Sequence, residues 1–519
     1  MRIERTKNAT RNIVVGMILK IYQLLVPFVI RTVMIHMLGM EYLGLNSLFT
    51  SILQVLNLAE LGVGSAMVFS MYKPIAEDDS ATINDLMRLY QFYYRIIGII
   101  ILTVGIIITP FIPKLIKSDI PSGLNIYILY YLNLVATVIS YWLFAYKNCL
   151  LTAHQRSDVI SKVTIITNTV MYVSQIIALL LFKSYYIYLI IALLGQILLN
   201  IGTAITADRM FPEYRPSKIF NKKLSKDINQ RIKDLFTSKI GEIIVNSADS
   251  IVISAFLGLT ILASYNSYFY ILSAILGFVL LFLQACTAGI GNSLIVETLE
   301  KNYNDLKELT LIVTWITGFC SCCLMCIYQP FMKIWIGEEN IFPISCVVCF
   351  VIYFFFRCVN QLFIVYKDAA GMWHEDRFRP LATALTNLIL NLILVQIIGI
   401  YGVLLSTVIS TLVVGMPWLL NNIFTVIFHV KMGEFLRNFV FYIGVTCINV
   451  LLTYMACEAI PVGGIMCIVV RLILCCIIPN AFYLLAYRQK KEFKQAVMLM
   501  DKILGSKVHF LHKILIKLL

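Results

Sequence analysis

The sequence predicts an all-α, polytopic membrane protein of about 14 transmembrane helices. The first observation is composition, because 60% of the 519 residues are hydrophobic, 13% are charged and the mean hydropathy is +0.85. Soluble proteins carry roughly 45–50% apolar and about 25% charged residues. The second is that the apolar residues form runs of the roughly 20 residues needed to cross a bilayer. Together these exclude a soluble enzyme, a nucleic-acid-binding domain and a disordered chain.

Fourteen apolar runs are long enough to be membrane spans. They cover residues 13–37, 43–71, 92–113, 124–146, 159–182, 185–206, 236–257, 262–296, 309–332, 342–365, 380–398, 401–426, 438–458 and 463–487. The first contains Lys20 and Arg31 and no small-residue cleavage site follows it, so we expect a span rather than a signal peptide. The second and eighth exceed one crossing, and each has a Gly-x-Gly interruption, at residues 62–64 and 289–291. We expect these two helices to bend there or to continue beyond the membrane.

The third observation is the distribution of basic residues between the connections. One alternating set of connections, which includes both termini, holds 32 Lys and Arg, whereas the other set holds 4 and the spans hold 6. Because basic connections stay in the cytoplasm, both termini are predicted to be cytoplasmic. This also accounts for the net charge of +14 without nucleic acid. The outer loops are no longer than about ten residues, which argues against a membrane glycan polymerase or ligase.

The chain contains an internal repeat at a shift of about 220 residues. Leu38-Gly39 recurs as Leu257-Gly258, Asn84-Asp85-Leu86 as Asn304-Asp305-Leu306, and Thr167-Asn168 as Thr386-Asn387. Each repeat holds six spans, so the two repeats have the same orientation. Such repeats are related by an axis along the membrane normal and place a substrate site at their interface.

The repeat predicts five segments along the chain. They are an N-terminal six-helix lobe (1–206), a basic cytoplasmic linker (207–235), a C-terminal six-helix lobe (236–426), two additional transmembrane helices (427–487) and a basic cytoplasmic tail (488–519). In the tail, apolar residues recur at steps of three and four with lysines between them. This pattern predicts an amphipathic helix on the anionic inner leaflet. The alternative is a helix packed on the protein.

Charged residues inside the spans predict a cationic cavity, because such residues are expensive in lipid and usually functional. Lys20, Gln23 and Arg31 share one helical face of the first span. The repeat maps Lys20 onto Lys239 and Gln23 onto Glu242. Two equivalent lysines would face each other across the repeat axis. The alternatives are that Lys20 and Lys239 reach the membrane surface with their side chains, and that Lys239 pairs with Glu242 on its own helix.

Other polar residues of the spans have two candidate roles. Glu60, Glu242 and Asp249 are candidates for counter-charges or for the carboxylate that carries a coupling ion. Gln23, Asn246, Asn387 and Asn391 are candidates for sugar contacts, although hydrogen bonding between helices is the favoured interpretation of Asn387 and Asn391. Arg357, beside Asn360 and Gln361, is a further candidate cation of the cavity.

The fourteen cysteines suggest packing rather than metal binding. Cys320, Cys322, Cys323 and Cys326 form C-x-C-C-x-x-C, and Cys346 with Cys349 forms C-x-x-C. Both motifs lie in the middle of spans with no histidine or carboxylate beside them, where cysteine behaves as a small hydrophobe. We therefore expect no metal site, no catalytic site and no cofactor beyond a coupling Na⁺ or H⁺.

Three stretches of the chain resemble a known family. They are Leu43–Lys73 with its Ala59-Glu60-Leu61-Gly62-Val63-Gly64-Ser65-Ala66 segment; Asn246–Ile251 followed by Phe256-Leu257-Gly258 and Tyr265; and Tyr366–Trp373 followed by Asp376-Arg377, Asn387–Asn391 and Gly399–Val403. These resemble the O-antigen and capsular or exopolysaccharide flippases, in the polysaccharide-transport branch of the MOP exporter superfamily. The resemblance extends to about residue 487.

The resemblance implies a flippase of the bacterial plasma membrane. Its substrate would be an oligosaccharide on undecaprenyl diphosphate, moved from the inner to the outer leaflet by alternating access of two lobes. Cationic residues lining the cavity would engage the diphosphate, and a carboxylate would carry a coupling H⁺ or Na⁺. A polysaccharide polymerase and glycosyltransferases would be partners. Two alternatives remain: an ion-coupled multidrug antiporter, and a lipid II flippase, which we would expect to have more arginines than Arg31 in its first two spans.

Overall fold

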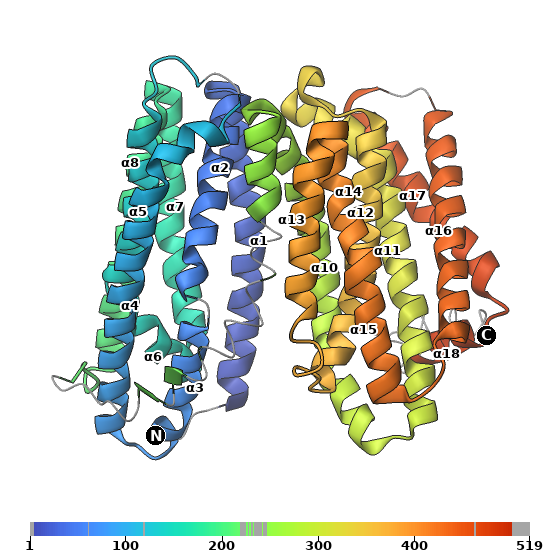
Figure 1. Ribbon diagram of the computed structural model, residues 1–519, viewed down its shortest axis with the longest axis horizontal. Helices are drawn as coiled ribbons and strands as arrows, with labels where there is room; N and C mark the ends of the chain where they lie inside the picture. Colours follow the sequence, from blue (N-terminus) through green and yellow to red (C-terminus); the bar gives the residue numbers. More distant parts are fainter. Residues whose placement is uncertain are drawn as a thin grey trace. The chain divides into compact units, whose positions relative to one another are not determined.

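The described part of the chain is helical throughout. The computed structural model describes residues 5–60, 62–117, 120–217, 247–460 and 463–500, with isolated positions at 225, 226, 228, 229, 232 and 241 (Figure 1). Within these ranges there is no strand. The expected all-α class is therefore confirmed. The side of the membrane on which the termini lie stays a prediction.

Contacts divide the chain into two compact units, Met1–Asn266 and Ser267–Leu519. The first unit contains helices separated by short turns. They are α1 (Arg5–Met37), α2 (Met40–Leu56), the 3₁₀ turn η1 (Asn57–Glu60), α3 (Val63–Ala76), α4 (Ser80–Ile108), the 3₁₀ segment η2 (Thr109–Leu115), α5 (Ile126–Trp142), α6 (Lys147–Ala153), α7 (Ser157–Phe182) and α8 (Tyr185–Met210). Helix α10 (Leu259–Val296) begins in this unit and continues into the second.

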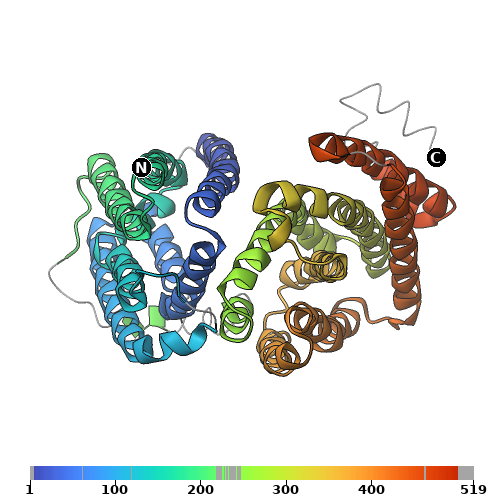
Figure 2. The ribbon, with the colours of Figure 1, turned by 90° about the horizontal axis from the view of Figure 1, so that it is seen from above.

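The second unit consists of the remaining elements. They are α11 (Leu299–Ile336), the 3₁₀ turn η3 (Glu338–Asn340), α12 (Ile344–Ala369), α13 (Arg379–Ile398), α14 (Ile400–Ser410), the π-helical η4 (Thr411–Gly415), α15 (Met416–Asn422), the π-helical η5 (Ile423–Phe428), α16 (Gly433–Glu458), α17 (Gly464–Tyr487) and α18 (Lys491–Met500). Figure 2 shows many of the long helices of each unit close to end-on.

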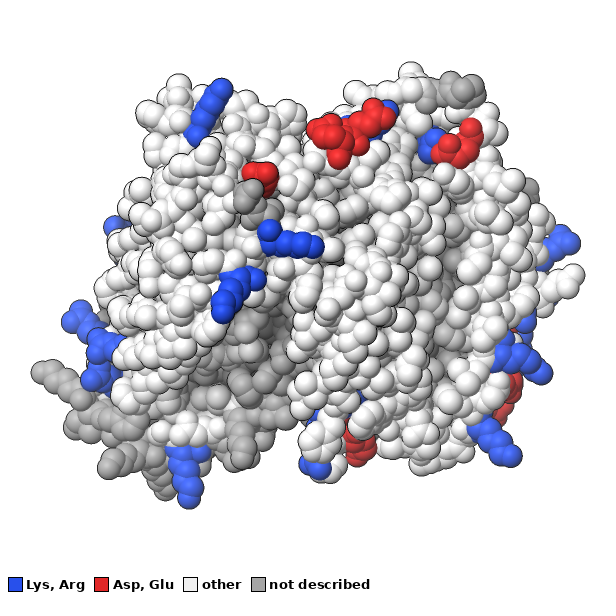
Figure 3. Space-filling view, turned by 45° about the horizontal axis from the view of Figure 1, so that its top comes forward, with Lys and Arg blue, Asp and Glu red and all other residues white. Residues whose placement is uncertain are grey.

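The expected spans are found almost everywhere that the structure describes them. Twelve helices or helix runs are long and apolar enough to cross a membrane, and the α5–α6 pair, bent by 55°, makes a thirteenth. Each coincides with one of the predicted runs. In the remaining run, 236–257, residues 236–240 and 242–246 lie outside the described residues, and the described part contains the short apolar helix Ser247–Phe256. Most of the face in Figure 3 carries neither basic nor acidic side chains, as a lipid-facing surface requires.

The two glycine interruptions behave differently. In the second span the α-helix stops at Leu56, passes through η1, and restarts at Val63 after Gly62, whose φ of 85° is a left-handed conformation that favours glycine. In the eighth span α10 continues without a break through Gly289 and Gly291. Only the first of these interruptions breaks the helix, and it places Glu60 where the regular helix has ended.

Helix α1 packs on only part of its circumference within the first unit. It contacts α7 and α2, while α4, α5 and α8 pack on one another elsewhere in the unit. Only 6% of its most apolar window is buried. Tyr22 on α1 and Thr169 on α7 share a hydrogen bond of 2.9 Å. The remaining surface of α1 is therefore available to lipid, to substrate or to other parts of the protein.

Helix α11 is the packing centre of the second unit. It contacts α12, α16, α17 and α18, so the two additional helices are attached mainly to it. Gly318 permits the approach of α17, since a Cβ there would lie 1.8 Å from the Tyr483 hydroxyl oxygen. The α18 part of the tail packs on this unit: Phe493 is 2% exposed and stacks on Trp315 at 5.8 Å. The rest of the tail, 501–519, lies outside the described residues.

Candidate functional site

The broken second span places a carboxylate among tyrosines of two neighbouring helices. The Tyr94 hydroxyl of α4 donates to Oε1 of Glu60 at 2.7 Å, and the Tyr141 hydroxyl of α5 lies 3.1 Å from Oε2. Tyr141 also lies 3.2 Å from Oδ1 of Asn57, and the Tyr90 hydroxyl donates to that of Tyr94 at 2.5 Å. We call these five residues the Glu60 cluster.

The Glu60 cluster is a part-buried set of oxygen atoms with one formal negative charge. In the part of the chain that the structure describes, no Lys or Arg forms an ion pair with Glu60. Gly64 makes room for the cluster, because a Cβ at this position would lie 3.1 Å from the Tyr90 hydroxyl. Carboxylate, amide and hydroxyl oxygens suit hard cations such as Na⁺, and a carboxylate can instead take a proton.

The candidate cations of the first span differ in exposure within their unit. Lys20 and Gln23 are exposed, whereas Arg31 is part-buried. Several large apolar side chains of α1, including Ile21 and Leu25, are also exposed. Between Ile13 and Val29, the exposed side chains of α1 are thus apolar except for one ammonium and one amide group.

The candidates on the seventh span are only partly visible. Lys239, Glu242 and Asn246 lie outside the described residues, so the symmetry between Lys20 and Lys239 stays a prediction. Asp249 is 9% exposed, and its Oδ2 accepts a hydrogen bond of 3.2 Å from the Tyr265 hydroxyl of α10. Two candidate carboxylates, Glu60 and Asp249, therefore both accept from tyrosine.

The asparagines of α13 are engaged inside the second unit. Asn387 donates to the Thr407 hydroxyl at 2.9 Å, Asn391 donates to Oδ1 of Asn387 at 3.2 Å, and Ser406 donates to Oδ1 of Asn391 at 2.5 Å. Both asparagines are fully buried. This geometry is that of hydrogen bonding between α13 and α14. Arg357 is part-buried on α12, one turn from the buried Asn360.

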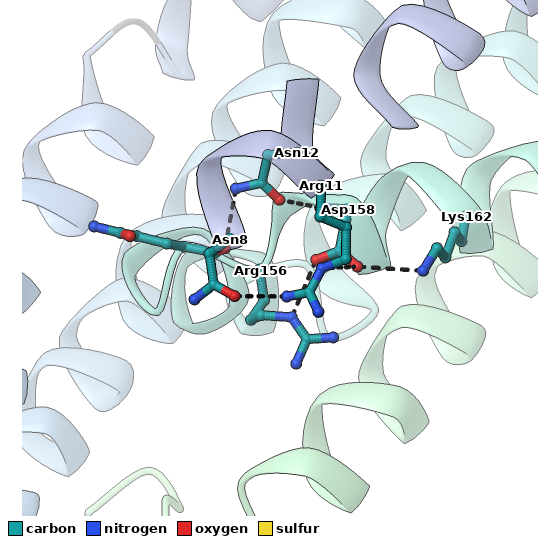
Figure 4. A network of polar contacts seen from close by, with 7 residues as sticks. Asn8, Arg11, Asn12, Arg156, Asp158 and Lys162 are labelled. Carbon is teal, nitrogen blue, oxygen red and sulfur yellow. Dashed lines mark hydrogen bonds and ion pairs between the residues drawn. The ribbon is translucent and has the colours of Figure 1, made fainter. Parts of the chain in front are cut away.

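An ion-pair cluster that the sequence reasoning did not identify joins the N-terminal part of α1 to the start of α7 (Figure 4). Asp158 is fully buried and pairs with Nε of Arg11 at 3.0 Å, Nε of Arg156 at 3.0 Å and Nζ of Lys162 at 3.3 Å. Its backbone N–H donates to Oδ1 of Asn12 at 2.8 Å. Asn12 in turn donates to the Gln155 carbonyl at 3.0 Å. Its amide therefore both accepts from and donates to the backbone just before and at the start of α7. The R-x-D-x-x-x-K spacing at the start of a helix was the sequence pattern from which this cluster could have been predicted.

The Asp158 cluster fixes the N-terminal part of α1 to α7. The carboxylate has no exposure, whereas the side chains of Arg11, Arg156 and Lys162 are 31%, 27% and 54% exposed. Three cations surround one anion, so the cluster has an excess of positive charge. We regard it as a structural attachment of the candidate cationic helix, at a distance along α1 from Lys20.

A cavity of about 820 Å³ in the second unit is unsuited to a diphosphate. It lies at the end of α10 and the start of α11, with Gln495 and Met498 of α18 on its wall. Glu300, Asp305 and Glu308 line it, with Lys301 as the basic residue among the lining side chains. Its net negative lining would repel phosphate groups.

Fold and site together describe a polytopic helical protein with ionisable residues in its candidate membrane spans. Residues 9–288, more than half of the chain, match the family model described as "Polysaccharide biosynthesis protein". The chain belongs to this family. Its membership confirms the family resemblance seen in the sequence.

Solved structures of MOP transporters have the same fold. "Lipid II flippase MurJ, inward closed conformation" matches with a TM-score of 0.66 at 16% identity, covering 92% of this chain and 99% of the other. An inward-facing multidrug resistance MATE transporter matches with a TM-score of 0.59 at 15% identity, covering 77% and 93%. The MATE transporter VcmN of Vibrio cholerae gives 0.53 at 12%, covering 80% and 96%. No curated protein sequence matches. At these identities the likeness concerns the fold alone.

Proposed function

We propose that this protein moves an undecaprenyl-diphosphate-linked oligosaccharide from the inner to the outer leaflet of the bacterial plasma membrane. Alternating access of two lobes would carry the substrate, for synthesis of a cell-surface polysaccharide. The family match over residues 9–288 supports this proposal, because the family is described as one of polysaccharide biosynthesis. A polysaccharide polymerase and glycosyltransferases would act after and before the flippase.

Among the candidate cations, Lys20 has the strongest support as the residue that binds the diphosphate of the substrate. It is exposed among exposed apolar side chains of α1 such as Ile21 and Leu25, and an ammonium group left in lipid costs about 2.5–3.5 kcal/mol at a helix centre. Contact with an anionic group removes that cost, because ionised pairs make strong hydrogen bonds. Arg31, on the same helix, would extend the anion site, and Lys239 and Arg357 are its proposed continuation. Gln23, one turn from Lys20, and Asn246 are the amides proposed to contact sugars.

Glu60 is the proposed coupling carboxylate. A carboxylate that accepts from neutral hydroxyls and lacks an ion pair in the described structure can exchange its tyrosine donors for a Na⁺ ion, or can take a proton. It lies at a break in the second span, where backbone groups are free of the regular helix. Binding there can therefore bias the local helix geometry, as transport coupling requires. Asp249 is the second candidate and Glu242 the third.

Two alternatives rest on specific observations. The MurJ match covers 99% of that chain, which favours a lipid II flippase. The MATE matches and the acidic Glu60 cluster favour an ion-coupled multidrug antiporter, whose cationic substrates suit a carboxylate. The proposed function and the two alternatives differ in which molecule accumulates inside the cell when the protein is missing.

Depletion of the protein followed by lipid extraction and mass analysis separates these functions. We expect an undecaprenyl-diphosphate oligosaccharide other than lipid II to accumulate, and its mass gives the composition of the repeat unit. Accumulation of lipid II alone would support the first alternative. Sensitivity to cationic drugs without any lipid-linked glycan would support the second.

A further inference from the structure

Three buried cysteine side chains from three helices converge in the second unit. They are Cys326 of α11, Cys457 of α16 and Cys475 of α17. Their sulfur atoms all lie within 4.8 Å of one another, and each residue is fully buried. We call this set the thiol cluster. No two of these three cysteines come from the same C-x-x-C motif, because helices that are distant in the sequence form the cluster by packing together.

Packing as a small apolar side chain explains why a single cysteine is buried. It does not explain why the side chains of these three cysteines point toward one another. The same helices carry Cys447 on α16 and Cys476 on α17, which are exposed. The buried sulfurs instead meet at one point. Metal–thiolate bonds of about 2.3 Å place three trigonal sulfurs roughly 4 Å apart. The observed limit of 4.8 Å is therefore close to the spacing of a three-sulfur metal site.

An arginine beside the thiol cluster supplies a second, independent observation. Arg471 of α17 donates from Nη1 to the backbone carbonyl of Cys326 at 2.9 Å, and its Nη2 pairs with Glu458 at 2.8 Å. Its Nε is buried and has no hydrogen-bond partner in the described structure. The positively charged guanidinium group of Arg471 therefore lies against the backbone of one residue of the thiol cluster. Glu458 is 48% exposed, so solvent reaches this end of the site.

We propose that Cys326, Cys457 and Cys475 bind one Cu⁺ ion in a three-coordinate thiolate site. Soft thiolates select Cu⁺ or Zn²⁺, and structural zinc takes four ligands rather than three. Cys323 packs against the cluster, yet its sulfur is not within the common 4.8 Å limit. Binding forms three copper–sulfur bonds and releases the thiol protons to solvent, with no change in oxidation state. The ion would fasten α16 and α17 to α11, whatever the substrate of the transporter.

Copper retention by the purified full-length protein tests the proposal. The protein is prepared in detergent under anaerobic reducing conditions, loaded with Cu⁺, and stripped of weakly bound copper by a Cu⁺ chelator. The triple variant Cys326→Ala/Cys457→Ala/Cys475→Ala is compared with Cys447→Ala/Cys476→Ala, which removes exposed cysteines from two of the same helices. We expect the wild type and the control to retain about one more copper per chain than the triple variant. X-ray absorption should show sulfur neighbours alone, at about 2.3 Å.

Three results would overturn the proposal. The first is equal copper retention by the triple variant and the wild type. The second is a disulfide between two of the three cysteines in protein purified without reductant, because it would remove the ligands. The third is preferential retention of zinc that depends on Cys323. If the triple variant fails to fold, X-ray absorption of the loaded wild type decides, since copper without sulfur neighbours contradicts the site.

Discussion

The hydroxyl of Tyr94 donates a 2.7 Å hydrogen bond to Oε1 of Glu60. Glu60 lies within the break in the second span, and Tyr94 lies on the intact helix α4. The bond therefore joins the irregular part of one span to a regular neighbour. The energy of such a bond depends on the charge of the carboxylate, because hydrogen bonds to charged groups contribute about 1.5–3 kcal/mol against about 1 kcal/mol for neutral ones. A change in the charge of Glu60 therefore changes the strength of the bond that holds the irregular part of the second span to α4.

We predict that Glu60→Gln lowers transport while leaving the amount of folded protein unchanged. Glutamine keeps the size of the side chain and removes the charge that a proton or Na⁺ would neutralise. Tyr94→Phe removes one donor and should shift the ion dependence of transport by roughly 2- to 30-fold, as the difference of about 0.5–2 kcal/mol between the charged and the neutral bond implies. Transport of a lipid-linked oligosaccharide into the outer leaflet is measured against Na⁺ concentration and pH.

The matched control is Glu77→Gln, which changes an exposed carboxylate just after α3 that pairs with Lys73. We expect wild-type ion dependence from this variant. If Glu60→Gln retained the full rate and the wild-type ion dependence, Glu60 would not be the coupling residue, and Asp249 would be tested next.

We predict that Lys20→Ala abolishes substrate transport by removing the ammonium group proposed to meet the diphosphate. Lys183→Ala is the control, because Lys183 is an exposed lysine at the C-terminal end of another span. Binding of the diphosphate lipid by the detergent-solubilised variants should fall by about 10-fold or more for Lys20→Ala, the effect of one charge-assisted bond. Equal binding by the two variants would place Lys20 in lipid or at the membrane surface instead.

We predict that Asp158→Asn destabilises the first unit. The substitution leaves Arg11, Arg156 and Lys162 around a neutral group. Removal of one partner from a fully buried pair costs about 3–5 kcal/mol, and partial exposure of these cations reduces the expected value to about 2 kcal/mol. Glu338→Gln, in an exposed pair with Lys333, should have an effect below about 1 kcal/mol. Thermal melting in detergent compares them, and equal melting temperatures would contradict the attachment role of Asp158.

We predict that stability falls below about pH 6.5 through His154, which lies between α6 and α7. Burial lowers the pKa of His154, and the bond to the Leu150 carbonyl only partly opposes this. The ring is 5% exposed and packs on Phe211 at 4.2 Å. Because the unfolded chain binds the proton more readily, stability is complete above the unfolded pKa and decreases as pH falls, by up to about 1.4 kcal/mol per unit.

The histidine prediction is tested by melting the protein from about pH 8 to about pH 5.5. His154→Phe should flatten the acid side of the profile even if it lowers the melting temperature overall. His374 is exposed and lies at the position of His154 in the second repeat. His374→Phe should keep the wild-type dependence of the melting temperature on pH. Identical slopes in wild type and His154→Phe would show that another group titrates.

The spans could be predicted from the sequence because each is a local run of apolar residues. Packing between distant segments could not. Glu60 was identified as an intramembrane charge, but its tyrosine partners come from α4 and α5, which no local pattern relates to it. Asp158 was missed because it stands among basic residues at a span boundary, where charge is ordinary. Cys326 was noted within C-x-C-C-x-x-C, yet its neighbours Cys457 and Cys475 come from the two added helices.

Transport by the purified protein in liposomes tests the central claim most directly. An undecaprenyl-diphosphate oligosaccharide is placed in liposomes with the protein, and its appearance in the other leaflet is followed with a glycan-modifying enzyme added to one side. We predict accelerated transfer that depends on a Na⁺ or H⁺ gradient and is lost in Lys20→Ala. Transfer no faster than in protein-free liposomes, in the presence of either gradient and with folded protein, would contradict the account.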